Sequence, residues 1–231
     1  MTDIKDNDFE QAAVVSEELM RKVDKESDYR ILTGFFAKLI AAIAITFSVF
    51  QIYTAGFGTL DAMLQRAVHL AFALCLIFLL YPARTSWPRN KVHPIDVIFA
   101  ILGAAAPLYI VVFYQDLVRR AGLVTTTDYI IGIIAVLLIL DAVRRVVGLP
   151  MVCVAITLIA YALFGRQLPG ALAHRGSDLP TLVQHLFYTT EGVFGIPLGV
   201  SSTFIFLFIL FGAFLEKTGL GQLFIDLSNA V

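Results

Sequence analysis

The strongest constraint on this chain is a set of long apolar runs that carry almost no charge. One run extends from Phe204 to Leu215 without a charged residue and ends at Glu216 and Lys217. Counted from Ile196, the segment is long enough to cross the hydrocarbon core of a bilayer, which takes roughly 20 residues in a helix. Lipid offers no partner to backbone N–H and C=O groups, so such a segment must be helical. The pattern predicts an integral membrane protein.

Similar runs recur along the chain and predict an all-α polytopic membrane protein with about six transmembrane helices. The composition agrees, since 58% of the 231 residues are hydrophobic and 15% are charged, whereas a soluble domain is about half apolar and a quarter charged. The predicted spans cover residues 34–55, 64–81, 95–114, 129–148, 149–164 and 196–215.

Two segments outside the spans are predicted to be amphipathic interfacial helices. Asp178 is an N-cap candidate with Pro180 in the first turn, and the apolar residues that follow fall on one helical face. Residues 1–33 form an acidic leader, which we interpret as a cytoplasmic helix at the headgroup level, with a partly disordered tail as the alternative. A third amphipathic pattern begins at Leu220.

The placement of Lys and Arg predicts a cytoplasmic N-terminus. With that orientation twelve Lys and Arg residues lie on the inner side and five on the outer side, namely Arg66, Arg119, Arg120, Arg166 and Arg175. The Arg144 and Arg145 side chains lie one helical turn beyond Asp141, on the same face. We interpret this set either as a charged collar that anchors the helix end at the interface or as a contact to another part of the protein or to a lipid phosphate.

The sequence offers no catalytic or metal-binding pattern. We therefore predict that the protein is not an enzyme and has no catalytic residue, no metal site and no cofactor. A near-zero net charge argues against nucleic acid as a partner. Cys75 and Cys153 are expected to be buried free thiols. Ser201 follows Gly199 and Val200, but we expect no histidine of a span to lie where it could activate that hydroxyl.

Few polar residues are expected inside the spans. Arg66 and His69 are placed near the outer end of the second span, within reach of headgroups or water. The spans hold essentially no ionisable residue at depth, where such residues mark transport paths. The Gly195–Gly199 break predicts a hinge or a tight turn at the entry to the last span. Small residues around Gly103 predict close helix packing, with a substrate path as the alternative.

Three stretches resemble the permeases of tripartite ATP-independent periplasmic (TRAP) transporters. They are Ala171-Leu172-Ala173-His174-Arg175-Gly176, the run from Thr190 to Ser201, and the run from Phe211 to Gly219. The similarity is closest to fused permeases that work with binding proteins of the TAXI class. Residues 141–148 resemble the segment that joins the small and large membrane parts of such fusions.

The resemblance implies a domain organisation and a function. Residues 34–147 would correspond to the four-span small subunit, and residues 148–231 to the beginning of the large permease domain, truncated before its substrate site. The implied partners are a periplasmic TAXI-type binding protein, the remaining large permease domain and membrane lipids. The implied activity is uptake of organic anions such as carboxylates across the inner membrane, with sodium as the coupling ion. The family's binding sites lie further along the large domain, so the substrate-binding residues stay unknown.

Other function classes stay open at this point. A small accessory or scaffold membrane protein needs no intramembrane charge and would bind only partner helices. A multi-span membrane enzyme would need clustered His, Asp or Glu residues, and a channel would need a polar ring at a constriction; the sequence shows neither pattern.

Overall fold

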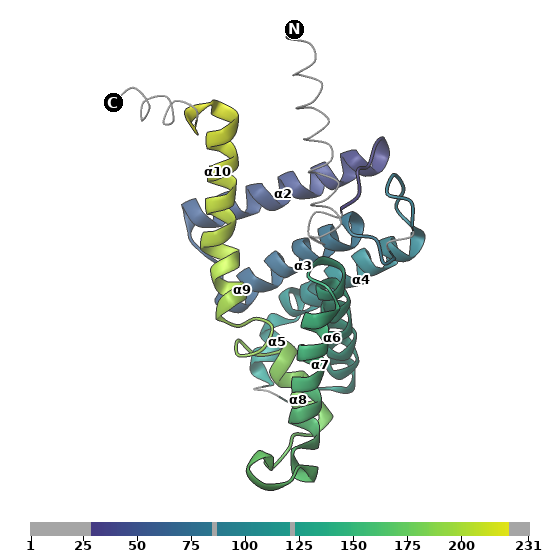
Figure 1. Cartoon of the computed structure of the whole chain (residues 1–231). Helices are drawn as coiled ribbons and strands as arrows, with labels where there is room; N and C mark the ends of the chain where they lie inside the picture. Colours follow the sequence, from purple (N-terminus) through teal and green to yellow (C-terminus); the bar gives the residue numbers. More distant parts are fainter. Residues whose placement is uncertain (1–28, 85–86, 121–122, 222–231) are drawn as a thin grey trace, which may run out of the picture.

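The computed structural model describes residues 29–84, 87–120 and 123–221, and these residues form helices and connecting turns without a β-strand (Figure 1). The all-α prediction is therefore confirmed. The predictions for the leader and for the pattern that begins at Leu220 lie almost entirely outside the described residues.

The helices follow one another with short connections. The first long helices are α2 (Phe35–Phe57), α3 (Ala62–Leu80) and α4 (Pro94–Val112), followed by the short α5 (Tyr114–Arg119). The next are α6 (Thr126–Val146), α7 (Leu149–Phe164), two 3₁₀ turns (Gly165–Gln167 and Gly170–Leu172) and α8 (Leu179–Phe187). A last, uninterrupted helix comprises α9 (Ile196–Val200), the π-helical segment η4 (Ser201–Ile205) and α10 (Phe206–Thr218).

Five helical segments of the described chain are long and apolar enough to cross a membrane: Phe35–Phe57, Ala62–Leu80, Pro94–Val112, Leu149–Gln167 and Ile196–Thr218. They confirm a polytopic membrane protein. The predicted count of about six exceeds these five by one. The additional predicted span corresponds to α6, which has 21 residues but carries Asp128, Asp141, Arg144 and Arg145.

The boundaries of α6 and α7 have local causes in the sequence. Thr125 and Asp128 form a reciprocal capping box at the start of α6, which satisfies two of the backbone donors that a helix start leaves free. Gly148 lies between α6 and α7 with φ = 113°, a conformation that is strained for any residue with a Cβ. The helix then restarts with Pro150 in its first turn, where the missing N–H costs nothing.

The core lies between α3 and α4, which run side by side (Figure 1). Its buried residues include Ala67, Leu74, Phe78, Ala106 and Ile110. A Cβ at Gly103 of α4 would lie only 2.8 Å from the Phe78 ring. The prediction that small residues near Gly103 permit close packing is thus confirmed.

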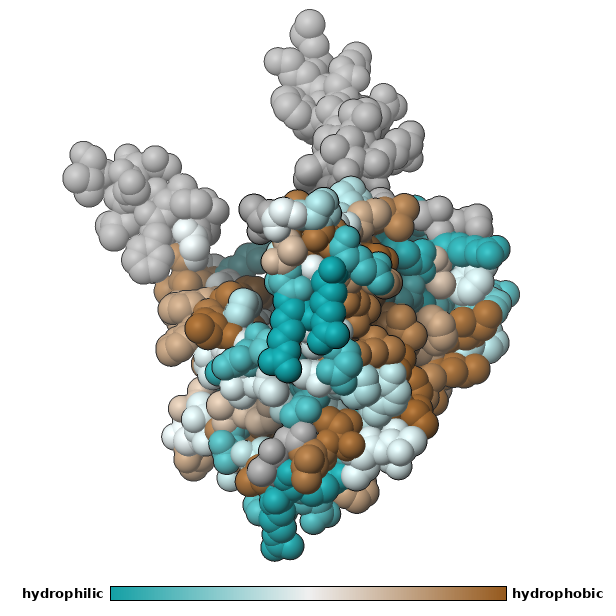
Figure 2. Space-filling view, turned by 90° about the horizontal axis from the view of Figure 1, so that it is seen from below, coloured by the Kyte–Doolittle hydropathy of each residue, from teal (hydrophilic) through white to brown (hydrophobic). Residues whose placement is uncertain are grey.

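Helices α2 and α10 lie at the edge of the molecule. Figure 1 shows α10 crossing α2 steeply, and the two helices are in contact. None of the residues of α10 is buried, and only Phe47, Gln51 and Thr54 of α2 are. Seen from below, hydrophilic side chains occupy the middle of the molecular face and hydrophobic ones extend along one side (Figure 2). Such apolar surfaces are what a bilayer covers.

Candidate functional site

The first buried polar cluster joins the end of α3, the start of α4 and the end of α6. Asp96 accepts from Arg30 Nη2 at 2.5 Å on one carboxylate oxygen and from Arg145 Nη1 at 2.6 Å on the other. All three side chains are completely excluded from solvent. The guanidinium of Arg145 also lies over the rings of Phe78 and Phe99, at 4.7 and 5.4 Å from their centroids.

The same arginines hold the backbone where α3 ends. Arg30 Nη1 donates to Leu79 O and Arg145 Nη1 to Tyr81 O, while Arg144 Nη2 donates to Ala83 O. These bonds satisfy carbonyls that a helix end leaves without an intrahelical partner. The cluster therefore fixes the α3–α4 connection against α6.

Asp141 accepts from both Arg144 and Arg145, at 2.6 and 2.7 Å. The contact interpretation of this set is confirmed within the chain, because both arginines also reach the end of α3. Asp96 lies in the first turn of α4, at the end of the apolar segment, and is fully buried within the protein. Such burial is costly unless the charge is paired and hydrogen-bonded, as it is here.

The second buried cluster lies between α2, α3 and the π-helical segment. Gln51 Nε2 lies 2.6 Å from His69 Nδ1, and Gln65 Nε2 donates to Gln51 Oε1 at 3.2 Å. His69 Nε2 lies 3.2 Å from Ser201 Oγ. His69 is only 5% exposed, so its predicted position within reach of headgroups or water was wrong.

This arrangement also overturns the expectation that no histidine lies near Ser201, although it does not create a nucleophile. Because Gln51 Oε1 accepts from Gln65, Gln51 Nε2 must be the donor to His69 Nδ1. The proton of the neutral imidazole then resides on Nε2, and His69 donates to Ser201 Oγ. A general base needs a free lone pair at that nitrogen, which this tautomer does not have.

The π-helical segment is held open by a side chain of α3. Phe206 N donates to Ser201 O, five residues earlier, in place of the bond to Ser202 O that an α-helix would make. Ser202 O instead accepts from Gln65 Nε2 at 3.2 Å. Short π segments of this kind occur frequently at functional sites. The predicted hinge or turn at Gly195–Gly199 was wrong, because the turn lies at residues 188–195 and the helix already begins at Ile196.

The third cluster surrounds Asp128 at the start of α6. Its carboxylate accepts from Tyr109 Oη at 2.6 Å, Arg120 Nη1 at 2.6 Å, and the Thr125 hydroxyl at 2.7 Å. The Tyr188 hydroxyl donates to the backbone oxygen of Asp128 at 2.7 Å. Burial of the phenol, helped by the Asp128 charge, raises the pKa of Tyr188, so the hydroxyl stays protonated as a donor.

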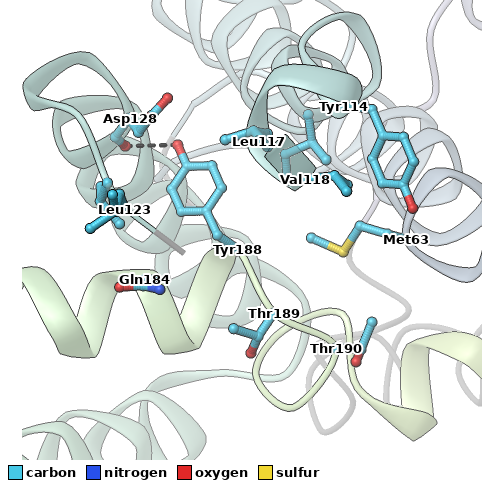
Figure 3. Close-up of a pocket in the computed structure, with 12 residues that line it drawn as sticks. Met63, Tyr114, Leu117, Val118, Leu123, Asp128, Gln184, Tyr188, Thr189 and Thr190 are labelled. Atoms are coloured by element: carbon cyan, nitrogen blue, oxygen red, sulfur yellow. Dashed lines mark hydrogen bonds between the residues drawn. The ribbon is translucent and has the colours of Figure 1, made fainter. Parts of the chain in front are cut away.

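A pocket of about 390 Å³ lies beside this cluster (Figure 3). Met63, Leu117 and Val118 line one side, and Tyr188 stands in the middle with its hydroxyl toward Asp128. Thr189 and Thr190, from the turn after α8, close the bottom in this view. The pocket is mainly apolar with a few polar groups, as small-molecule sites usually are.

Asp96, Gln51 and Gln65 belong to these clusters although the sequence did not predict them as members. The thiols of Cys75 and Cys153 are free, as expected, but Cys153 is exposed rather than buried. In the part of the chain that the structure describes, no group of three or more His, Cys, Asp or Glu residues could hold a metal ion.

Comparison with known families gives one match. Residues 131–231 match the family model "Tripartite ATP-independent periplasmic transporter, DctM component". The matched region begins within α6 and extends through α7, α8 and the last helix. No curated protein matches the chain. No solved structure matches it either.

DctM is a transporter component rather than an enzyme, which fits the prediction of no enzyme activity. It also fits the five apolar helices of the described chain. The five apolar helices support a multi-pass membrane protein, and its residues 131–231 are similar to the permease component of TRAP transporters.

Proposed function

We propose that this chain is part of a fused TRAP permease that takes up an organic anion delivered by a periplasmic binding protein of the TAXI class. The observation that carries the proposal is the DctM match on a chain of membrane-spanning helices. Sodium is the proposed coupling ion, and the inner membrane is the proposed location, with the N-terminus in the cytoplasm. Residues 34–147 are proposed to act as the small-subunit equivalent and residues 148–231 as the beginning of the large domain.

Contacts across residue 148 support a fixed association of these two parts. Tyr188 of the second part bonds to Asp128 of the first, and Arg66 of α3 donates to Phe194 O. Ser201 and Ser202 bond to His69 and Gln65 of α3. Hydrogen bonds within a membrane protein keep its helices associated where lipid provides no hydrophobic drive. The first part would thus brace the first helices of the permease domain.

Transport is tested with the complete reading frame that contains this chain, reconstituted in liposomes with its binding protein. We expect uptake of a labelled carboxylate when a sodium gradient is directed inward, and none when choline replaces sodium. Residues 1–231 alone are expected to give no uptake. Uptake without a binding protein, or equal uptake in choline, would contradict the proposal.

Orientation is tested with single cysteines in a background without Cys75 and Cys153. Arg175→Cys is expected to react with a membrane-impermeant maleimide added to spheroplasts, whereas Thr2→Cys is expected to react only after lysis. Reaction of Thr2→Cys from outside would reverse the proposed topology.

A further inference from the structure

Arg66 is a half-buried cation near the start of α3 that has no carboxylate partner among the described residues. Its Nη1 donates to Phe194 O at 2.5 Å, which fixes the side chain but does not neutralise its charge. An unpaired charge in a membrane protein is costly and usually marks a ligand contact. The surroundings of Arg66 therefore indicate what binds there.

The guanidinium of Arg66 lies against the backbone of Gly199 in α9. A Cβ at position 199 would come within 2.7 Å of Nη2 and 2.8 Å of Nε. Any other residue would displace the guanidinium. The glycine thus allows the cation to lie on the helix surface, beside a cavity of about 520 Å³ that both residues line.

Two sets of groups line this cavity. The polar set includes Arg66, Asp61 and Gln65, and the Gln65 amide oxygen is buried without a hydrogen-bond partner among the described residues. The apolar set includes Ile196, which is 77% exposed, and Phe204, which is 63% exposed. These apolar side chains belong to a helix that is long and apolar enough to cross a membrane, so their exposed surface is suited to contact with lipid.

Asp61 supplies a negative charge in the same cavity. Its side chain is exposed and makes no ion pair with Arg66 or with another described cation. Burial and the Asp61 carboxylate raise the pKa of Tyr114. The cavity thus offers a cation and an anion that do not pair with each other, together with exposed apolar side chains. These groups complement a ligand that has a negative group, a positive group and acyl chains.

We propose that this cavity binds a zwitterionic phospholipid with a primary ammonium headgroup. The phosphate binds the Arg66 guanidinium, which matches phosphate geometry with parallel N–H donors. The ammonium donates to the Asp61 carboxylate, a bond that a choline headgroup cannot make. An acyl chain lies along Ile196 and Phe204. The site goes beyond the proposed transport function and does not depend on it.

The test is native mass spectrometry of the delipidated 231-residue chain in detergent. Phosphatidylethanolamine, phosphatidylcholine and phosphatidylglycerol with identical acyl chains are titrated separately. We expect the ethanolamine lipid to bind on the order of tenfold more tightly than either of the others, the difference that one charge-assisted hydrogen bond typically makes. Equal affinities for all three lipids would overturn the proposal.

Variants separate the contributions of the two headgroup contacts. Asp61→Asn is expected to abolish the preference for ethanolamine over glycerol headgroups, whereas Asp116→Asn, an exposed carboxylate on α5, leaves it unchanged. Arg66→Gln is expected to weaken binding of all three lipids on the order of tenfold or more. Unchanged binding in Arg66→Gln would refute the phosphate contact.

Gly199→Ala tests the same contact while Arg66 itself is retained. This variant therefore tests the proposal even if Arg66→Gln fails to fold. Its Cβ displaces the guanidinium, so we expect weaker binding of every lipid. The matched control is Gly212→Ala in the same helix, where a Cβ meets no atom within 4 Å and no change is expected. Similar binding in both glycine variants would count against the site.

Discussion

Arg145 of α6 and Asp96 of α4 form an ion pair of 2.6 Å although neither side chain has any solvent-exposed surface. Arg30, which precedes α2, pairs with the other oxygen of the same carboxylate. Asp96 therefore bridges two guanidinium groups at the point where three chain segments meet, and Asp141 also pairs with Arg145. The stability of this junction depends on keeping all three charges together.

Replacing Asp96 by Ala is expected to destabilise the protein by roughly 3–5 kcal/mol, because buried Arg30 would lose its Asp96 partner and buried Arg145 would keep only Asp141. The measurement is equilibrium unfolding in mixed micelles with increasing SDS. Asp116→Asn, at an exposed site on α5, is the control and is expected to stay close to the parent. The triple change Arg30→Met, Asp96→Leu and Arg145→Met is expected to recover much of the loss. A parent-like Asp96→Ala variant would show that the pair does not hold the junction.

Replacing Gln65 by Leu is expected to increase amide hydrogen exchange at residues 201–206. The change removes the donor to Ser202 O and to Gln51 Oε1, and buried groups left without partners cost about 1–3 kcal/mol each. Hydrogen–deuterium exchange with mass spectrometry of the detergent-solubilised chain gives the readout. Gln167→Leu, which alters an exposed glutamine, is the matched control. Unaltered exchange in the Gln65 variant would mean that the π segment needs no support from α3.

Replacing Tyr188 by Phe is expected to cost about 1 kcal/mol, the usual net contribution of one hydrogen bond. The lost bond is the one from the Tyr188 hydroxyl to Asp128 O. Tyr129→Phe alters a tyrosine of α6 whose hydroxyl has no hydrogen bond to a described residue, and it serves as the control.

The same variant tests the effect of alkaline pH. The folded state raises the pKa of Tyr188, so its stabilising contribution is fully present below the ordinary phenol pKa of about 10 and is lost as pH rises through the folded-state value. The Tyr188→Phe variant is expected to lose less stability above pH ~10 than the parent. A steeper loss in the variant would contradict the assigned direction.

Replacing Gly103 by Ala is expected to destabilise the α3–α4 core by about 1–3 kcal/mol, the usual cost of overpacking. The added Cβ would lie 2.8 Å from the Phe78 ring and 3.2 Å from Leu74 Cβ. Gly56→Ala in α2, where a Cβ meets no atom within 4 Å, is expected to be neutral or slightly stabilising. Both are measured by thermal unfolding in detergent, and equal midpoints would show that α3 and α4 separate easily.

The helices were predictable from the sequence because a helix that crosses lipid must have a certain length and an apolar composition. Both properties can be recognised in a single segment without knowledge of its neighbours. The start of the last span at Ile196, the N-cap at Asp178 and the break at Gly148 all match the structure. Each of these features depends on residues within one turn of it. The sequence therefore contains enough local information to place them.

The polar clusters were not predictable in the same way. The role of Asp96 as the centre of an ion-pair cluster depends on Arg30 and Arg145, which lie 66 and 49 residues away in the sequence. His69 looked like an interface residue because it lies close to the end of an apolar run. Its burial depends on Gln51 from α2 and Ser201 from the last helix, and hydropathy does not indicate which helices are neighbours.

The π segment at Ser201–Ile205 has a consequence for how this helix tolerates changes in its length. A single-turn π bulge amounts to one extra residue accommodated within an α-helix. Deleting one residue from this segment would restore regular α geometry while leaving the upstream and downstream faces in their present orientations. The same deletion elsewhere in the helix would rotate everything beyond it by about 100°. Deletion of one residue is therefore expected to be tolerated at this position and not at its neighbours.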